Sequence, residues 1–288
     1  MTQKRATPTV MRRRVGAQLR RYREPLMKSG DAAKLMGWDT TRLSRIERGL
    51  YRISAEEVRT LCDHYGVDDR EAITEISKAA EEPPGGGWWA PYAGRVSDAY
   101  LDFIELEAGA DAIRIHHPIV IPGPLQSPGY AREILTRAAT NLSKERAEML
   151  VRIRLARQDI LSRDDGPVQL HALVPEPALH ARFDSGPRVM RDQVRALIDA
   201  SEMSNVRLQV VPLTTHPAYA TKGPMTLLSF RHPWVPVGSV DNSMGGTHTE
   251  DPEQLNWLDA EFELLSSCAL PEDKSQDLLN EYLEGLYK

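Results

Sequence analysis

The chain has 288 residues, of which 41% are hydrophobic, and its formal net charge is −5. This length predicts more than one domain, and the hydrophobic content is sufficient for a packed core. No segment approaches the roughly 20 consecutive apolar residues that span a bilayer, and the arginine-rich start lacks the apolar stretch of a secretory signal. We therefore expect a cytoplasmic protein without a membrane partner.

Charge is distributed unevenly along the chain. The first 60 residues hold fifteen Lys and Arg against six Asp and Glu, although the whole chain is acidic. A basic first part can neutralise DNA phosphates, and an acidic remainder should stay away from them.

The two cysteines, Cys62 and Cys268, are too few for a disulfide framework or a zinc site, and we expect both to be buried thiols. We expect no cofactor and no metal.

The first part of the chain contains the pattern of a helix-turn-helix. A small residue, Ala33, stands where two helices would cross, and Gly37 is expected to end the first of them in a left-handed turn. Asp39 is expected to cap the second helix and to lie at the DNA surface. Leu43 and Ile46, three residues apart, form the inward face of that second helix.

The outward face of the second helix carries Thr40, Thr41, Arg42 and Arg45, and we expect it to bind DNA. Short hydroxyls and long guanidinium groups can match the donor and acceptor pattern of base edges in the major groove. Arg45 is the candidate for a contact to guanine, and Thr40 or Thr41 for a thymine methyl or a phosphate. Arg48, at the end of the helix, is expected to hold phosphate only.

Further helices are predicted on both sides of this motif. An arginine-rich helix is expected from Val10 to Met27. After the motif, Ser54 and Glu57 form an S-x-x-E capping box that opens a fourth helix. Asp68 is expected to cap a fifth helix, which runs from residue 69 to residue 82.

Five short helices with the helix-turn-helix as the second and third resemble the lambda-repressor-like, XRE-type DNA-binding domain. The resemblance implies an ion pair between Arg23 and Glu47, with Arg23 also touching a DNA phosphate. It implies double-stranded DNA as a partner. Because one helix-turn-helix reads about half of a two-fold site, we also expect a homodimer.

A linker separates this part from the rest of the chain. Residues 83–87 read P-P-G-G-G, which ends the fifth helix and cannot hold a regular element. We therefore expect a DNA-binding domain over residues 1–82, a linker over residues 83–87 and a second domain over residues 88–288.

The second domain is expected to be α+β, with a small antiparallel sheet of about four strands. Alternating apolar residues predict strands over Val168–Val174, Val206–Val211, Gly223–Phe230 and Val235–Asp241. Helices are expected over 99–109, from 128, and over 143–162, 176–183, 187–201, 252–270 and 273–287. The glycine-rich segment Gly245–His248 is expected to be a surface loop.

The function of the second domain stays open between two alternatives. A ligand sensor predicts a closed apolar pocket with a few polar groups, and a protein-binding platform predicts an exposed apolar patch. The candidate site residues are Trp88, Trp89, Tyr100, Glu107 and Arg157. The two tryptophans are more simply core aromatics, and Arg157 could reach an interior acid such as Glu107 or Glu176. The apolar stripe of the last helix could be a patch, a dimer seam or a face that packs on the sheet.

No catalytic motif is recognised, because the chain lacks a G-x-S-x-G elbow, a G-x-x-x-x-G-K-[ST] loop and an H-E-x-x-H pair. We therefore do not expect an enzyme.

The chain is similar to the WhiJ-like group of actinomycete XRE-type regulators. The similarity lies in the turn P-G-P-L-Q-S-P-G-Y-A over residues 122–131, the W-W pair, the E-L-E-A helix and the R-x-x-R-Q run. Their C-terminal domain has no known function. The resemblance implies a repressor-like transcriptional regulator, in some cases antitoxin-like, with a small acidic protein partner encoded by a neighbouring gene. The alternative is a regulator that senses a small-molecule effector.

Overall fold

The computed structural model describes residues 9–83, 86–137, 143–164, 166–216, 223–242 and 245–286. By contacts between residues, the chain divides into two compact units. The first unit comprises Met1–Leu106 and the loop Phe230–Val235, and the second comprises Glu107–Ser229 and Pro236–Lys288. This division falls at residue 106, whereas the sequence predicts a linker over residues 83–87, of which 84 and 85 lie outside the described residues.

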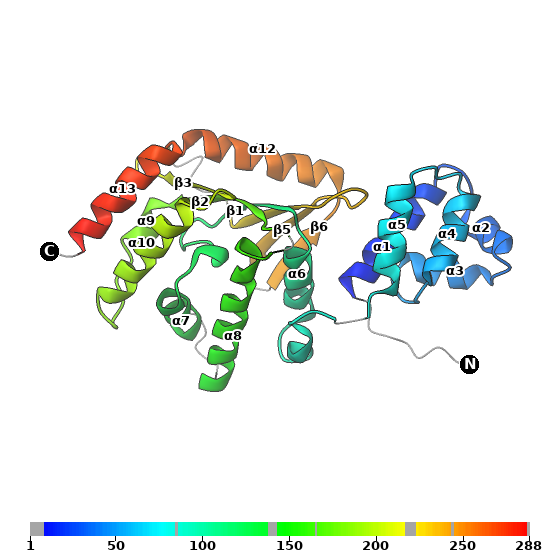
Figure 1. Ribbon diagram of the computed structural model, residues 1–288, viewed down its shortest axis with the longest axis horizontal. Helices are drawn as coiled ribbons and strands as arrows, with labels where there is room; N and C mark the ends of the chain where they lie inside the picture. Colours follow the sequence, from blue (N-terminus) through cyan, green and yellow to red (C-terminus); the bar gives the residue numbers. More distant parts are fainter. Residues whose placement is uncertain are drawn as a thin grey trace. The chain divides into compact units, whose positions relative to one another are not determined.

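The first unit begins with five helices in the predicted order (Figure 1). They are α1 (Val10–Arg23), α2 (Ser29–Leu35), α3 (Thr40–Glu47), α4 (Ala55–His64) and α5 (Arg70–Glu81). The short helix η1 (Ala90–Tyr92) and the first part of α6 (Asp98–Ala108) follow. Helix α1 ends four residues before the predicted Met27, because Pro25 has no N–H with which to continue the helical hydrogen bonds.

Side-chain caps begin the fourth and fifth helices. Ser54 and Glu57 form the predicted capping box, in which each side chain accepts a hydrogen bond from the backbone N–H of the other residue, at 3.2 and 3.0 Å. The cap of α5 is Asp69 and not Asp68, so that prediction is wrong by one residue. Asp69 Oδ1 accepts a hydrogen bond of 3.0 Å from the N–H of Ala72.

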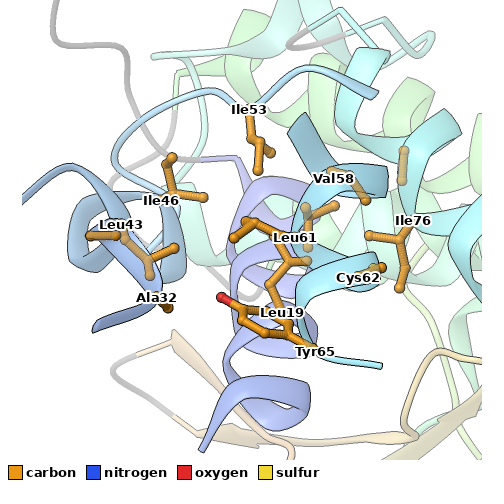
Figure 2. Close-up of a cluster of buried hydrophobic side chains, with 13 residues drawn as sticks. Leu19, Ala32, Leu43, Ile46, Ile53, Val58, Leu61, Cys62, Tyr65 and Ile76 are labelled. Carbon is orange, nitrogen blue, oxygen red and sulfur yellow. The ribbon is translucent and has the colours of Figure 1, made fainter. Parts of the chain in front are cut away.

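The helix-turn-helix closes over a buried core, which Figure 2 shows. Ala33 is fully buried, and Gly37 has a φ of 65° after the end of α2, as the sequence predicts. Leu43 and Ile46 point into the core from α3 and are 0% and 1% exposed. They pack in one cluster with side chains from the other four helices and from the loop after α3, among them Leu19, Ala32, Ile53, Leu61 and Ile76.

The loop Phe230–Val235 belongs to this first unit and packs on α1. The guanidinium carbon of Arg14 lies 3.8 Å from the centroid of the Phe230 ring and 5.4 Å from that of Trp234. Arg14 Nη2 also donates a hydrogen bond of 2.6 Å to the backbone oxygen of Val235. Arg14 is therefore a packing residue, in spite of its place in an arginine-rich helix.

The second unit contains a six-stranded sheet in the order β3-β2-β1-β4-β5-β6. Its strands are β1 (Ala112–His116), β2 (Gln169–Pro175), β3 (Val206–Val211), β4 (Met225–Ser229), β5 (Val237–Asn242) and β6 (Gly245–Thr249). Strand β2 pairs in parallel with β1 and β3, and the other pairs are antiparallel. The sheet is mixed, so the prediction of a small antiparallel sheet of four strands is wrong.

Helices between the first three strands explain the parallel part. Strands β1 and β2 are separated by η2 (Gly123–Leu125), α7 (Pro128–Arg137), α8 (Lys144–Ala156) and η3 (Arg157–Leu161), and strands β2 and β3 by α9 (Glu176–Leu179) and α10 (Arg188–Ser201). Such crossovers return the chain to the same edge of the sheet, which a hairpin cannot do. Strand β6 begins with two glycines, and it was predicted as a loop because glycine gives no strand signal.

Helices cover the sheet on both faces in Figure 1, with α12 (Pro252–Cys268) on one side and α7 and α8 on the other. From α12, Leu258, Phe262 and Leu265 pack in one core cluster with Leu173, Met225 and Leu227 of the sheet. The last helix, α13 (Glu272–Gly285), packs on α10 and β3, and the predicted helix end at Tyr287 lies outside the described residues. Cys62 is buried as expected, but Cys268, the last residue of α12, is only half-buried, so that expectation is wrong for Cys268.

Candidate nucleic-acid interface

Helix α3 presents a polar face to solvent and an apolar face to the core. Thr40, Thr41 and Arg45 are exposed, whereas Leu43 and Ile46 are buried. The separation follows from the helical period, which places residues three and four apart on one side. The exposed face is therefore available for a contact with a base edge.

Tyr51, in the loop after α3, contacts Arg45. Arg45 Nη1 is hydrogen-bonded to the hydroxyl of Tyr51, and the guanidinium carbon lies 5.1 Å from the centroid of the Tyr51 ring. Cation–π contact and hydrogen bond together restrict the rotamers of Arg45, which is the best candidate for base recognition on this face. Sequence reasoning missed Tyr51, because it lies outside the helix-turn-helix pattern.

Arg42 is turned toward the protein. Its guanidinium carbon lies 4.2 Å from the centroid of the Trp38 ring, and its Nη2 forms an ion pair with Glu57. Glu57 is also the acid of the capping box of α4. Arg42 thus joins the start of α3 to the start of α4, and its predicted DNA contact requires the guanidinium to bind a phosphate while it stays near Glu57.

Side-chain hydrogen bonds are present at both ends of α3. At the start, Asp39 Oδ1 accepts a hydrogen bond of 2.7 Å from the N–H of Thr41. This backbone hydrogen bond lowers the pKa of the Asp39 carboxyl below its ordinary value. At the end, exposed Arg48 donates from Nε to the backbone oxygen of Ser44 at 3.2 Å. Arg48 lies beyond the central turn of α3, where a phosphate contact is the geometry expected of it.

Arg23 and Glu47 form the ion pair that the sequence predicts. Arg23 Nε lies 2.6 Å from Glu47 Oε1, and Arg23 Nη2 lies 3.0 Å from Glu47 Oε2. Both side chains are only 7% exposed, and Arg23 Nη1 also donates to the backbone oxygen of Met27 at 2.9 Å. The pair fixes the end of α3 to α1 and to the turn before α2. The phosphate contact of Arg23 stays a prediction.

Two glycines allow α1 and α3 to approach closely. A Cβ added to Gly16 would lie 2.3 Å from the backbone oxygen of Ile46 and 2.7 Å from that of Glu47. Gly49, with a φ of 69°, leaves no room for a Cβ against the backbone of Arg13. Sequence reasoning missed Gly16, because a single glycine in a helical pattern shows no spacing that points to its neighbour.

The five candidate residues for a ligand or partner site are placed in two groups. Glu107 and Arg157 pair with each other through two hydrogen bonds of 2.6 and 2.8 Å, with side chains 1% and 6% exposed. Each therefore satisfies the other, and Glu107 rather than Glu176 is the partner of Arg157. Trp88, Trp89 and Tyr100 belong to the first unit, where the centroids of the two indole rings lie 5.8 Å apart in an edge-to-face contact. Trp88 is 38% exposed and Trp89 is half-buried, so the expectation that they are core aromatics of the second domain is wrong.

In the described part of the chain, no helix is both long and apolar enough to cross a membrane. Within the same residues, no three His, Cys, Asp or Glu side chains come together in a way that could hold a metal ion.

Two protein-family models match the chain. Residues 14–73 match a helix-turn-helix domain, and residues 100–281 match a domain of unknown function, DUF5753. Searches of the curated proteins and of the solved structures gave no match. Because the second match covers more than half of the chain, the protein belongs to the DUF5753 family, in which it carries an N-terminal helix-turn-helix domain.

Proposed function

We propose that the protein is a sequence-specific DNA-binding regulator of transcription, and that α3 enters the major groove of its operator. The observation that carries this proposal is the face of α3, where Thr40, Thr41 and Arg45 are exposed on a helix anchored by buried Leu43 and Ile46. The match of residues 14–73 to a helix-turn-helix domain supports it. We assign no catalytic role to the chain.

We further propose that the protein acts as a repressor by occupying its operator as a homodimer. One recognition helix reads about half of a site, and a two-fold dimer reads two half-sites about one helical turn apart. The second domain would bind the small acidic protein that the sequence resemblance implies.

Selection from a random duplex library tests the proposal. The full-length protein should enrich an inverted repeat whose half-site centres lie roughly 10 base pairs or a multiple of that apart. Native mass measurement with the selected duplex should then show two chains on each DNA molecule. An enriched pool with no shared sequence would contradict sequence-specific binding, and one chain on each duplex would contradict the dimer.

A matched control separates recognition from charge. Arg59 is exposed on α4, so Arg59→Ala removes one positive charge without altering α3. That variant should select the same repeat as the unaltered protein.

A further inference from the structure

The second unit contains a pocket that DNA binding does not use. It has a volume of about 360 Å³ and lies between the turn Pro124–Pro128, the end of η3 and one side of α10. Ligand pockets have volumes of roughly 300–1,000 Å³, so this one suits a small molecule. The turn is the central part of the segment P-G-P-L-Q-S-P-G-Y-A, to which the proposed function gives no role.

Buried side chains hold the wall of the pocket in place. Gln193, fully buried on α10, accepts a hydrogen bond of 2.7 Å from the N–H of Ser127 and donates one of 2.8 Å to the oxygen of Leu125. Gln158 donates from Nε2 to the backbone oxygen of Gln126 at 2.5 Å. Because these contacts fix the turn to α10 and η3, ordering the site around a ligand would cost little conformational entropy.

The lining of the pocket has an apolar part and a charged part. Pro124, Leu125, Leu161 and Ala196 supply apolar surface. Asp192, Arg195 and Asp199 line the pocket from successive turns of α10. Residues three or four apart on a helix are neighbours, so Arg195 lies between two acids on one face.

We propose that this pocket binds an α-amino acid with an apolar side chain. Such a ligand carries a carboxylate and an ammonium on the same carbon, which matches a guanidinium and a carboxylate on adjacent turns. Asp192 already forms an ion pair of 3.5 Å with Arg188, so Asp199 binds the ammonium and Arg195 binds the carboxylate. The apolar side chain lies on Leu125 and Leu161. This site does not depend on the proposed DNA binding.

Three probes with the same isobutyl group test the proposal on the full-length protein. L-Leucine carries both charges, isoamylamine lacks the carboxylate, and 4-methylpentanoate lacks the ammonium. Saturation-transfer difference NMR titrations should show millimolar binding of L-leucine. Isoamylamine and 4-methylpentanoate should each bind about fivefold more weakly, the effect of losing one exposed charge contact.

Two variants assign the binding to this pocket. Arg195→Gln should weaken L-leucine about fivefold and leave isoamylamine unchanged, whereas Ala196→Phe should fill the pocket and abolish binding of all three probes. Arg191→Gln, on the same helix but outside the lining, is the matched control and should bind as the unaltered protein does. Circular dichroism melting checks that each variant is folded.

Three outcomes would overturn the proposal. The first is an absence of L-leucine binding at concentrations up to tens of millimolar. The second is equal binding of the three probes, which would show that the charged side chains play no part. The third is an equal loss of L-leucine binding in Arg195→Gln and Arg191→Gln, which would place any binding elsewhere.

Discussion

Arg23 of α1 and Glu47 at the end of α3 form a buried ion pair that contains two hydrogen bonds, of 2.6 and 3.0 Å. The pair joins the first helix of the DNA-binding unit to the helix that carries the candidate recognition residues. It therefore fixes the direction in which α3 presents Arg45 to solvent.

Removing one partner of this pair should be costly, because it leaves the other charge buried without a counter-charge. We expect Glu47→Gln to lower the free energy of unfolding of the first unit by about 3 kcal/mol, and Arg23→Met combined with Glu47→Met to lower it by less. Urea unfolding of the unaltered protein, Glu47→Gln and the double variant measures both values. If Glu47→Gln unfolds at the same urea concentration as the unaltered protein, the pair has no structural role.

Gly16 gives a prediction with an unusual sign. Replacing an exposed glycine in a helix with alanine usually stabilises the protein by about 1 kcal/mol. Gly16→Ala should instead destabilise the first unit, because its Cβ would meet the backbone oxygens of Ile46 and Glu47. Gly30→Ala, whose Cβ would meet only a methyl carbon of Thr40 at 3.7 Å, is the control. A higher melting temperature for Gly16→Ala would disprove the close approach of α1 and α3.

Glu105 of α6 should make the stability of the protein depend on pH. Burial raises the pKa of its carboxyl from 4.5 to about 7, and nearby Asp102 and Glu82 act in the same direction. The folded state thus binds a proton more tightly than the unfolded state, so the free energy of unfolding should fall as pH rises from about 5 to 7.

Glu105→Gln should remove this dependence and raise the melting temperature at pH above 7. Glu284→Gln, an exposed position on α13, should leave the pH profile unchanged. Melting temperatures measured from about pH 5 to above pH 7 test this prediction. An identical pH profile for Glu105→Gln and the unaltered protein would count against a buried carboxyl.

The two cysteines should differ in reactivity. Burial raises the pKa of the Cys62 thiol to about 11, whereas Cys268 is half-buried. Because the thiolate is the reactive form, iodoacetamide at pH 8 should modify Cys268 first and Cys62 only after unfolding in urea. Mass spectrometry of peptides gives the two rates. Equal rates in the folded protein would contradict the burial of Cys62.

Local signals predicted the DNA-binding unit well. Asp39, Gly37 and the capping box at Ser54 act within one helical turn, so the residues that decide the local structure lie next to one another in the sequence. The pair of Arg23 and Glu47 is a contact between distant positions, and its prediction rests on the family resemblance and on the need of Glu47, next to apolar Ile46, for a counter-charge.

The second unit was predicted less well, because strand order depends on distant contacts. The alternation of apolar residues located β3 at its observed bounds, but it carries no information on which strand lies beside it or in which direction. Strand β6, with Gly245 and Gly246, pairs with β5 through the backbone and was missed. The position of Tyr51 beside Arg45 likewise depends on how the loop after α3 folds back.

The central claim is that α3 reads DNA bases through Arg45, and one measurement tests it most directly. Arg45→Ala and Arg48→Ala are titrated against the selected operator and random duplex DNA at several salt concentrations, with Arg59→Ala as the control. Arg45→Ala should lose about 1–3 kcal/mol of discrimination between operator and random DNA. Arg48→Ala should weaken both equally and lower the salt slope by about one. If Arg45→Ala keeps the ratio of affinities of the unaltered protein, α3 does not read bases through this residue and the account is contradicted.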